Sequence, residues 1–187
     1  MIHLSILSSS IRTDRKSHWV ALFFKQFIEE QKLATVEVLD LNEFNFPLFN
    51  ERLKFQKEPS AKAIEFAEKI KKTDGLIIVT PEYNGGYPAS LKNAIDLIYD
   101  EWHRKPVAIS TVSAGDFGGS QVVLSLQSVL WKMHALVSGE VFPVPKVAAN
   151  FNAEGTPADK EKIEKRAKKF IDELLWLVNA KKKMEGI

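Results

Sequence analysis

The chain contains no cysteine, and this absence removes several kinds of chemistry at once. Because none of the 187 residues is cysteine, the sequence excludes disulfides, thiolate catalysis, iron–sulfur clusters and cysteine-type zinc sites. The absence also fits a reducing compartment, so we expect a cytoplasmic protein. If the chain is an enzyme, a bound cofactor is a reasonable carrier of the chemistry.

Charge of one sign and long apolar runs are also scarce. The chain has 26 lysine and arginine residues and 24 aspartate and glutamate residues, so its net charge is +2. Such a small positive charge does not indicate a nucleic-acid-binding protein. Met1 to Leu7 has neither a basic stretch nor a small-residue cleavage site, so no secretory signal is expected. Apolar runs such as Leu174 to Val178 are far shorter than the ~20 residues of a membrane span. We therefore expect binding to neither nucleic acid nor membranes.

Length and composition are those of one globular domain. The chain has 187 residues, 45% hydrophobic and 27% charged, within the usual ~100–200 residues per domain. We expect a single domain over residues 1–187. Its last helix is expected at about 157–183, because Thr156 can cap a helix whose first position is Pro157.

Short apolar runs alternate with segments of helical spacing along the chain. The expected strands are 2–7, 35–41, 76–80, 106–112 and 141–144. The expected helices are 17–31, a segment from Pro59-Ser60 to Asp74-Gly75, 88–102, 118–136 and the last helix, with 42–58 irregular. This alternation predicts an α/β fold with a doubly wound, five-stranded parallel sheet of flavodoxin-like order 2-1-3-4-5, with helices on both faces. Such sheets bind ligands beyond the carboxyl ends of their strands, so the loops after the first, third and fourth strands are candidates.

The first of these loops, Ser8 to His18, gathers hydroxyl groups and cations before a helix. Arg12, Arg15 and Lys16 lie here beside several serines, and a helix N-terminus attracts phosphate. The loop is neither a Walker A motif nor a dinucleotide glycine motif, because it contains no glycine. The alternative is an ordinary polar turn in which Ser17 caps the helix.

The other two loops are rich in glycine. Asn84-Gly85-Gly86 follows the most apolar expected strand, and Gly115, Gly118 and Gly119 follow the next. Glycine permits close approach of the backbone to a ligand. The alternatives are a common turn in the second loop and steric relief at a helix start in the third.

A longer pattern resembles a known family. Pro81-Glu82-Tyr83-Asn84, followed by Pro88 to Asp96, is similar to the signature of the NAD(P)H-dependent FMN reductases, which include azoreductases, chromate reductases and quinone reductases. Ser9 to Arg12 resembles the family's Gly-Ser-x-Arg phosphate loop, with Ser9 at the usual glycine position, and 113–119 resembles its third loop. The resemblance spans Ile2 to about Phe142.

This resemblance implies an FMN site built from three groups of residues. The phosphate is expected at Ser8, Ser10, Arg12, Arg15, Ser17 and the amides of His18 and Trp19; the isoalloxazine at Pro81, Glu82, Tyr83 and Asn84; and its other side at Ser113, Gly115, Gly118 and Gly119. Which of Arg12, Arg15, Lys16 and Ser17 contacts the phosphate stays open. No catalytic side chain is expected, because the implied chemistry takes place at flavin N5. No metal is expected either, because no histidine–histidine or carboxylate–histidine spacing in the sequence suggests a metal site.

The implied reaction passes a hydride from NAD(P)H to FMN and then electrons to a small-molecule acceptor. A quinone, an azo compound, a free flavin and a metal oxyanion all remain open as acceptors. The resemblance also implies a homodimer or homotetramer, and the segment Phe44 to Phe49 is either a contact surface or a loop folded over its own core. The rival functions are an electron carrier of flavodoxin type without NAD(P)H oxidase activity, and a phosphate-responsive protein without redox activity.

Overall fold

Five parallel strands form the centre of the molecule, as the sequence predicts. The computed structural model describes residues 1–186. The strands are β1 (His3–Ser8), β2 (Thr35–Asp40), β3 (Gly75–Pro81), β4 (Pro106–Val112) and β5 (Leu136–Val144). Their order in the sheet is β2-β1-β3-β4-β5, and every neighbouring pair is parallel. The order reverses between β1 and β3, so the loops after these two strands diverge from a common edge.

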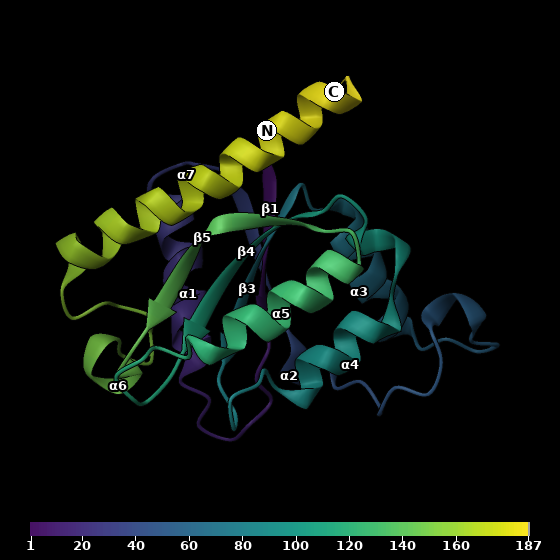
Figure 1. Cartoon of the computed structure of the whole chain (residues 1–187), viewed down its shortest axis with the longest axis horizontal. Coiled ribbons are helices and arrows are strands. Elements are labelled where there is room, and N and C mark those ends of the chain that lie inside the picture. The colour runs from purple at the N-terminus through teal and green to yellow at the C-terminus, as the bar shows by residue number, and fades with distance from the viewer. Residues whose placement is uncertain (187) are drawn as a thin grey trace.

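Helices cover both faces of this sheet (Figure 1). They are α1 (Ser17–Glu30), α2 (Leu41–Phe44), α3 (Ala61–Lys72), α4 (Ala89–Leu97), α5 (Gln121–Lys132), α6 (Val147–Asn150) and α7 (Lys160–Glu185), with short 3-10 turns at Leu53–Phe55 and Asp100–Trp102. The long helix α7 crosses the sheet beside α1, and the two share one core cluster with the strands. Helices α3, α4 and α5 bury their apolar sides in the second cluster on the opposite face. Within residues 1–186, no helix is both long enough and apolar enough to cross a membrane.

The apolar periodicity explains how the helices are held. In α1, Val20, Phe23, Phe24 and Phe27 are buried at helical spacing. The ring of Phe24 packs 5.0 Å from that of Phe142 in β5 and 5.3 Å from that of Phe170 in α7, measured between centroids. Aromatic pairs at such distances contribute about 0.5–1.5 kcal/mol beyond the burial of their area. These contacts join both helices to one face of the sheet.

Several expected boundaries were wrong, each for a local reason. Helix α7 begins at Lys160 rather than 157, because Phe151 and Pro157 form an antiparallel bridge and the side chain of Asp159 accepts a hydrogen bond from the amide of Lys162. Strand β5 begins at Leu136 rather than 141, since its first half carries Gly139 and Glu140 and so lacks an apolar run.

The other boundary errors lie at helix ends. Helix α4 ends at Leu97 because Ile98 is extended, and the buried indole of Trp102 donates to the carbonyl of Ile95. Helix α5 occupies 121–132 rather than 118–136, since Gly118 and Gly119 both have positive φ. The segment 42–58, expected to be irregular, contains α2 and one 3-10 turn.

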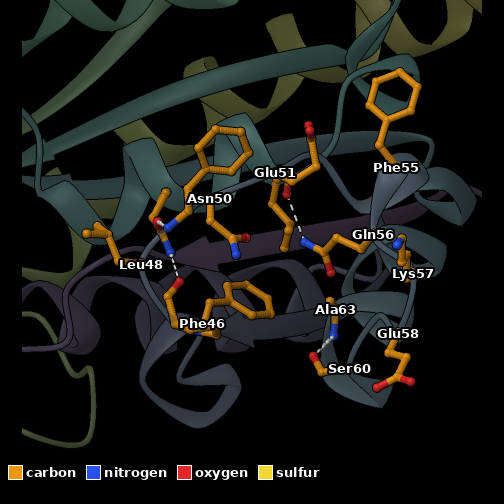
Figure 2. A pocket seen from close by; sticks show the side chains of 14 residues that line it. Phe46, Leu48, Asn50, Glu51, Phe55, Gln56, Lys57, Glu58, Ser60 and Ala63 are labelled. Carbon is orange, nitrogen blue, oxygen red and sulfur yellow. Dashed lines mark hydrogen bonds between the residues drawn. The ribbon is translucent and has the colours of Figure 1, made fainter.

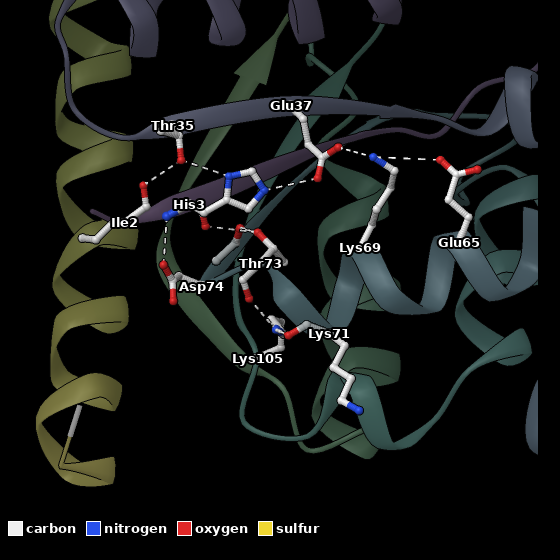
Figure 3. Close-up of polar contacts among 11 residues, drawn as sticks. Ile2, His3, Thr35, Glu37, Glu65, Lys69, Lys71, Thr73, Asp74 and Lys105 are labelled. Atoms are coloured by element: carbon white, nitrogen blue, oxygen red, sulfur yellow. Dashed lines mark hydrogen bonds and ion pairs between the residues drawn. The ribbon is translucent and has the colours of Figure 1, made fainter.

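A buried lysine lies at the amino ends of the parallel strands (Figure 3). Lys105, just before β4, is 4% exposed, and its Nζ donates to the carbonyls of Thr73 at 2.5 Å and Lys71 at 3.2 Å. Burial lowers the pKa of the Lys105 ammonium from 10.5 to about 8, and repulsion from Lys181 adds to it while Asp74 opposes it. The folded chain therefore releases this proton at lower pH than the unfolded chain does.

This difference predicts a rise in stability with pH. Between pH 8 and 10.5 the unfolded chain binds more protons at Lys105, so the free energy of unfolding should rise by up to about 1 kcal/mol per pH unit. The variant Lys105→Met should lack this slope. Urea unfolding of both proteins at several alkaline pH values measures it, with Lys168→Met, an exposed lysine paired with Asp172, as the control. Parallel pH profiles for wild type and Lys105→Met would contradict the prediction.

Candidate functional site

Three loops meet at the carboxyl edge of the sheet and enclose one cavity of about 420 Å³. The first joins β1 to α1, the second joins β3 to α4, and the third joins β4 to α5. Eight of the expected site residues line this cavity: Ser10, Arg12, Arg15, Ser17, Pro81, Glu82, Tyr83 and Ser113. The geometry therefore brings together residues from all three of the expected groups.

The first loop presents a run of free backbone amides. Within residues 1–186, the N–H groups from Thr13 to Ser17 donate to no backbone or side-chain acceptor. The next two amides, of His18 and Trp19, donate to the carbonyls of Arg15 and Lys16 at 3.1 and 3.2 Å. The donors available to an anion are thus the loop amides before the helix, rather than the His18 and Trp19 amides expected from the sequence.

Ser17 lies where a bound anion would complete its hydrogen bonding. It is the first residue of α1 and 3% exposed, and its Oγ has no partner among the described residues. The N-cap of α1 is Lys16, and no side chain caps the helix, so the alternative of a Ser17 cap is wrong. A buried hydroxyl without a partner is costly. This orphaned hydroxyl, the free amides and the positive end of the helix dipole together fit a phosphate group.

The two arginines of the first loop have different surroundings. Arg12 is exposed, its guanidinium lies 5.3 Å from the ring centroid of Tyr83, and no carboxylate within residues 1–186 forms an ion pair with it. Arg15 forms a bidentate ion pair with the buried Asp40 at the end of β2. The guanidinium of Arg12 is therefore the one left available for an anion.

The hydroxyl groups of the loop mainly hold the first two loops together. Ser10 Oγ lies 2.7 Å from the hydroxyl of Tyr83 in the second loop. Ser90 Oγ in α4 donates to the carbonyl of Ser9 at 2.6 Å. Ser8 Oγ lies 3.0 Å from Nδ1 of His18, outside the cavity. Burial lowers the pKa of the His18 imidazole, and the nearby Asp40 carboxylate opposes this shift.

The second loop is a tight two-residue turn. Tyr83 and Gly86 exchange backbone hydrogen bonds of 2.8 and 3.1 Å, and Asn84 and Gly85 between them have φ values of 53° and 78°. Positive φ at both central positions is the geometry that an Asn-Gly pair favours. The turn holds Tyr83 at the cavity wall, while Asn84 lies exposed at its tip and does not line the cavity.

In the third loop the glycines have two different roles. A Cβ on Gly118 would lie 3.0–3.1 Å from atoms of Pro143, Val144 and Pro145, and one on Gly119 would lie 3.2–3.3 Å from Thr111 and Val112. These two glycines let the loop pack on the ends of β4 and β5, which is the steric role left open by the sequence. Around Gly115 no atom of the described part of the chain lies within 4 Å of such a Cβ, so this part of the loop is open.

Some residues of the site carry no signal in the sequence. Thr13 and Asp14 supply free amides, and Ala114 and Val147 line the cavity. Asp40 is a single acid at the end of a strand, and only the structure shows that it pairs with Arg15. Backbone donors cannot be recognised from residue type, because every residue except proline has one.

Comparison with known proteins identifies relatives of this chain. Residues 2–149 match the family model described as NADPH-dependent FMN reductase. The NAD(P)H-dependent FMN reductase LOT6 of Saccharomyces cerevisiae is 36% identical over 152 residues, which cover 74% of this chain and 78% of that protein. A quinone reductase of Escherichia coli is 36% identical over 97 residues, covering 50% of this chain and 52% of that one.

Solved structures show the same fold. FerB, a flavoenzyme NAD(P)H:(acceptor) oxidoreductase from Paracoccus denitrificans, superposes with a TM-score of 0.75 at 22% identity and covers 93% of this chain and 97% of its own. The family is one of oxidoreductases, with FMN as its cofactor and NAD(P)H as its electron donor. With the family model matched from the first strand into α6, the chain belongs to the NADPH-dependent FMN reductase family.

Proposed function

We propose that this chain is an FMN-dependent NAD(P)H oxidoreductase in which the three-loop cavity holds FMN. The observation that carries the proposal is the first loop, where free amides, the unpartnered Ser17 hydroxyl and the unpaired Arg12 guanidinium converge. Each of these groups can donate a hydrogen bond to a phosphate oxygen, and their combined positive character would favour a dianion. The whole chain, residues 1–187, is proposed to act as one FMN-binding domain, and its cytoplasmic location stays a prediction from the sequence.

The residues of this chain bind and orient, while the cofactor supplies the chemistry. When bound, FMN supplies the capacity to accept a hydride from NAD(P)H and to pass electrons on to an acceptor. Ser17, Arg12 and the amides of Thr13 to Ser17 would hold the phosphate end. Tyr83 and the open backbone near Gly115 would form the walls at the ring end. The amides of Asn84 and Gly85 donate to no acceptor within residues 1–186, but neither residue lines the cavity, so we assign them no part in holding the ring.

The acceptor is proposed to be a small molecule: a quinone, an azo compound, a free flavin or a metal oxyanion. Support comes from the relatives, which are named as FMN reductases and quinone reductases. The test is an absorbance spectrum of the purified protein, followed by anaerobic mixing with NADPH or NADH. Bleaching of the bound flavin band is expected. A protein that takes up FMN but is not bleached by either nucleotide would be an electron carrier instead.

We also propose that the chain forms a homodimer or homotetramer, with the predicted contact segment Phe44 to Phe49 and the residues that follow it up to Glu58 at the contact. Residues of this stretch line a hollow of about 450 Å³ together with Ser60, Ala63, Asn93 and Leu97, and none of the expected cofactor residues lines it (Figure 2). Phe44 and Phe46 pack inward on Phe66, so half of the Phe-rich segment is folded over its own core. Leu48 and Phe55, which both line this hollow, are 86% and 62% exposed, and large exposed apolar side chains are typical of an interface.

Substituting Leu48 and Phe55 should weaken self-association. The variant Leu48→Glu/Phe55→Glu should raise the dissociation constant of the oligomer by about tenfold or more, because each buried charge opposes association. Sedimentation velocity over a concentration series measures it. The control is Leu124→Glu on α5, which is 77% exposed but outside this segment. A wild-type chain that sediments only as a monomer would contradict the proposed assembly.

A further inference from the structure

Asp40 is a buried carboxylate at the boundary of the candidate site. It is the last residue of β2 and 4% exposed. Both of its oxygens accept hydrogen bonds from the guanidinium of Arg15, with Nη2 2.6 Å from Oδ2. Arg15 is itself largely buried, with 18% of its side chain exposed. Bidentate pairs of this kind fix the geometry of both partners.

The pair connects the two ends of the first loop to the neighbouring strand. Nη1 of Arg15 also donates to the carbonyl of Ser10 at 3.1 Å, so the end of the loop is joined to its beginning. Asp40 Oδ1 accepts the amide of Asn42 at 3.0 Å, which fixes the carboxylate at the start of α2. Residues 11–14 form the arch between these anchored points, and the free amides begin within this arch at Thr13.

The neighbouring histidine leaves this pair undisturbed near neutral pH. Nδ1 of His18 lies 3.7 Å from Oδ2 of Asp40 and 3.0 Å from Oγ of Ser8. Burial lowers the pKa of His18, the Asp40 carboxylate raises it, Arg15 lowers it and Glu43 raises it, with a net lowering. The imidazole is therefore largely neutral at pH 7, and Arg15 is the cation that neutralises Asp40.

We propose that Asp40 is a positioning residue for the phosphate loop: by clamping Arg15 it holds the arch 11–14 open to a phosphate monoester. This inference rests on the proposed function, because it needs FMN to be the ligand. Asp40 does not line the cavity and so would not touch the phosphate itself. Its action is transmitted through Arg15 and the carbonyl of Ser10.

Charge and position predict opposite results when the Asp40 charge is removed. If Asp40 acted only through the electrostatic repulsion between its carboxylate and the phosphate, Asp40→Asn would tighten phosphate binding, because it removes a negative charge near the site. If Asp40 acts as a clamp, the same variant loses a charge-assisted bidentate contact and weakens binding. The expected loss in FMN affinity is ~10- to 100-fold, the range for hydrogen bonds between charged groups. Riboflavin, which lacks the phosphate, should bind wild type and Asp40→Asn with affinities within ~3-fold of each other.

The experiment is a fluorescence titration of flavin-free protein with FMN and with riboflavin. Arg15→Lys keeps the charge but not the two-pronged geometry and should reproduce the loss, while the double variant should lose no more than either single one. The control is Glu37→Gln on the same strand, a carboxylate paired with Lys69 and His3 at the far end of β2 (Figure 3). This variant should leave both flavin affinities unchanged.

The outcomes separate the inference from the function on which it rests. Equal weakening of FMN and riboflavin by Asp40→Asn overturns the clamp in favour of a general loss of structure. Unchanged or tighter FMN binding by a folded Asp40→Asn also overturns it, while the proposed function stands. If the wild-type chain binds neither flavin, the proposed function fails, and the inference fails with it.

Discussion

Replacing Arg12 with alanine should weaken FMN binding by about 100-fold, because its guanidinium is the one in the first loop that has no carboxylate partner among residues 1–186. Arg15 has its charge neutralised by Asp40, and its two Nη nitrogens already donate three hydrogen bonds, two to Asp40 and one to the carbonyl of Ser10. Arg12 is instead held beside Tyr83, at the wall of the cavity that Ser17 and the free amides line. A phosphate dianion placed there would form its charge-assisted contacts with Arg12 rather than Arg15.

The measurement is a pair of titrations, with FMN and with riboflavin, on the flavin-free variant. Riboflavin affinity should change little, because the lost contact is to phosphate. The matched control is Arg52→Ala: Arg52 also stacks on a tyrosine, 4.6 Å from the ring centroid of Tyr99, but lies outside the three loops. Equal losses for FMN and riboflavin, or no loss for FMN, would show that Arg12 is not a phosphate ligand.

The same two arginines show how far the sequence predicts this site. Arg12, Arg15 and Lys16 are equivalent in a pattern of residue types, so their concentration predicts an anion site but not which one faces it. The distinction comes from Asp40, which lies 25 residues from Arg15 in the chain and meets it only because β2 pairs with β1. The sequence also cannot show which backbone amides are free, because every residue except proline has an N–H group and only the fold decides which of these groups find an acceptor.

The fold is predicted more completely than the site, for a physical reason. A strand buried on both faces is mostly apolar and carries no charge, so β3 and β4 are evident from their residues alone. The edge strand β5 mixes buried Phe142 and Val144 with exposed Gly139, and only its second half is recognisable. The start of α7 is missed because a tertiary bridge, Phe151 to Pro157, holds residues that local preference would place in the helix.

Gly155, which no motif marks, should be among the positions least tolerant of substitution. It is buried with φ +86°, and an added Cβ would lie 2.7 Å from the amide nitrogen of Phe23 and 2.9 Å from the carbonyl oxygen of Trp19. Both of these atoms belong to the backbone of α1, which cannot turn aside as a side chain can. The left-handed conformation alone costs an alanine about 1 kcal/mol, and the clash adds to this. We expect Gly155→Ala to lower the free energy of unfolding by about 3 kcal/mol or more.

The loss of stability in Gly155→Ala should be greatest in α1, the helix that follows the first loop. The segment before α7 is held on α1 by Gly155 and by Gln26, whose side chain donates to the carbonyl of Glu154 at 2.8 Å. Urea unfolding compares Gly155→Ala with Gly139→Ala in β5, where nothing lies within 4 Å of an added Cβ, so that this control should stay within ~0.5 kcal/mol of wild type. Hydrogen exchange should then show faster opening of α1 in Gly155→Ala. Equal stability of the two variants would contradict the prediction. It would mean that the segment around Gly155 can shift without disturbing α1, so that the position of Ser17 in α1 depends only on the contacts of this helix with the sheet.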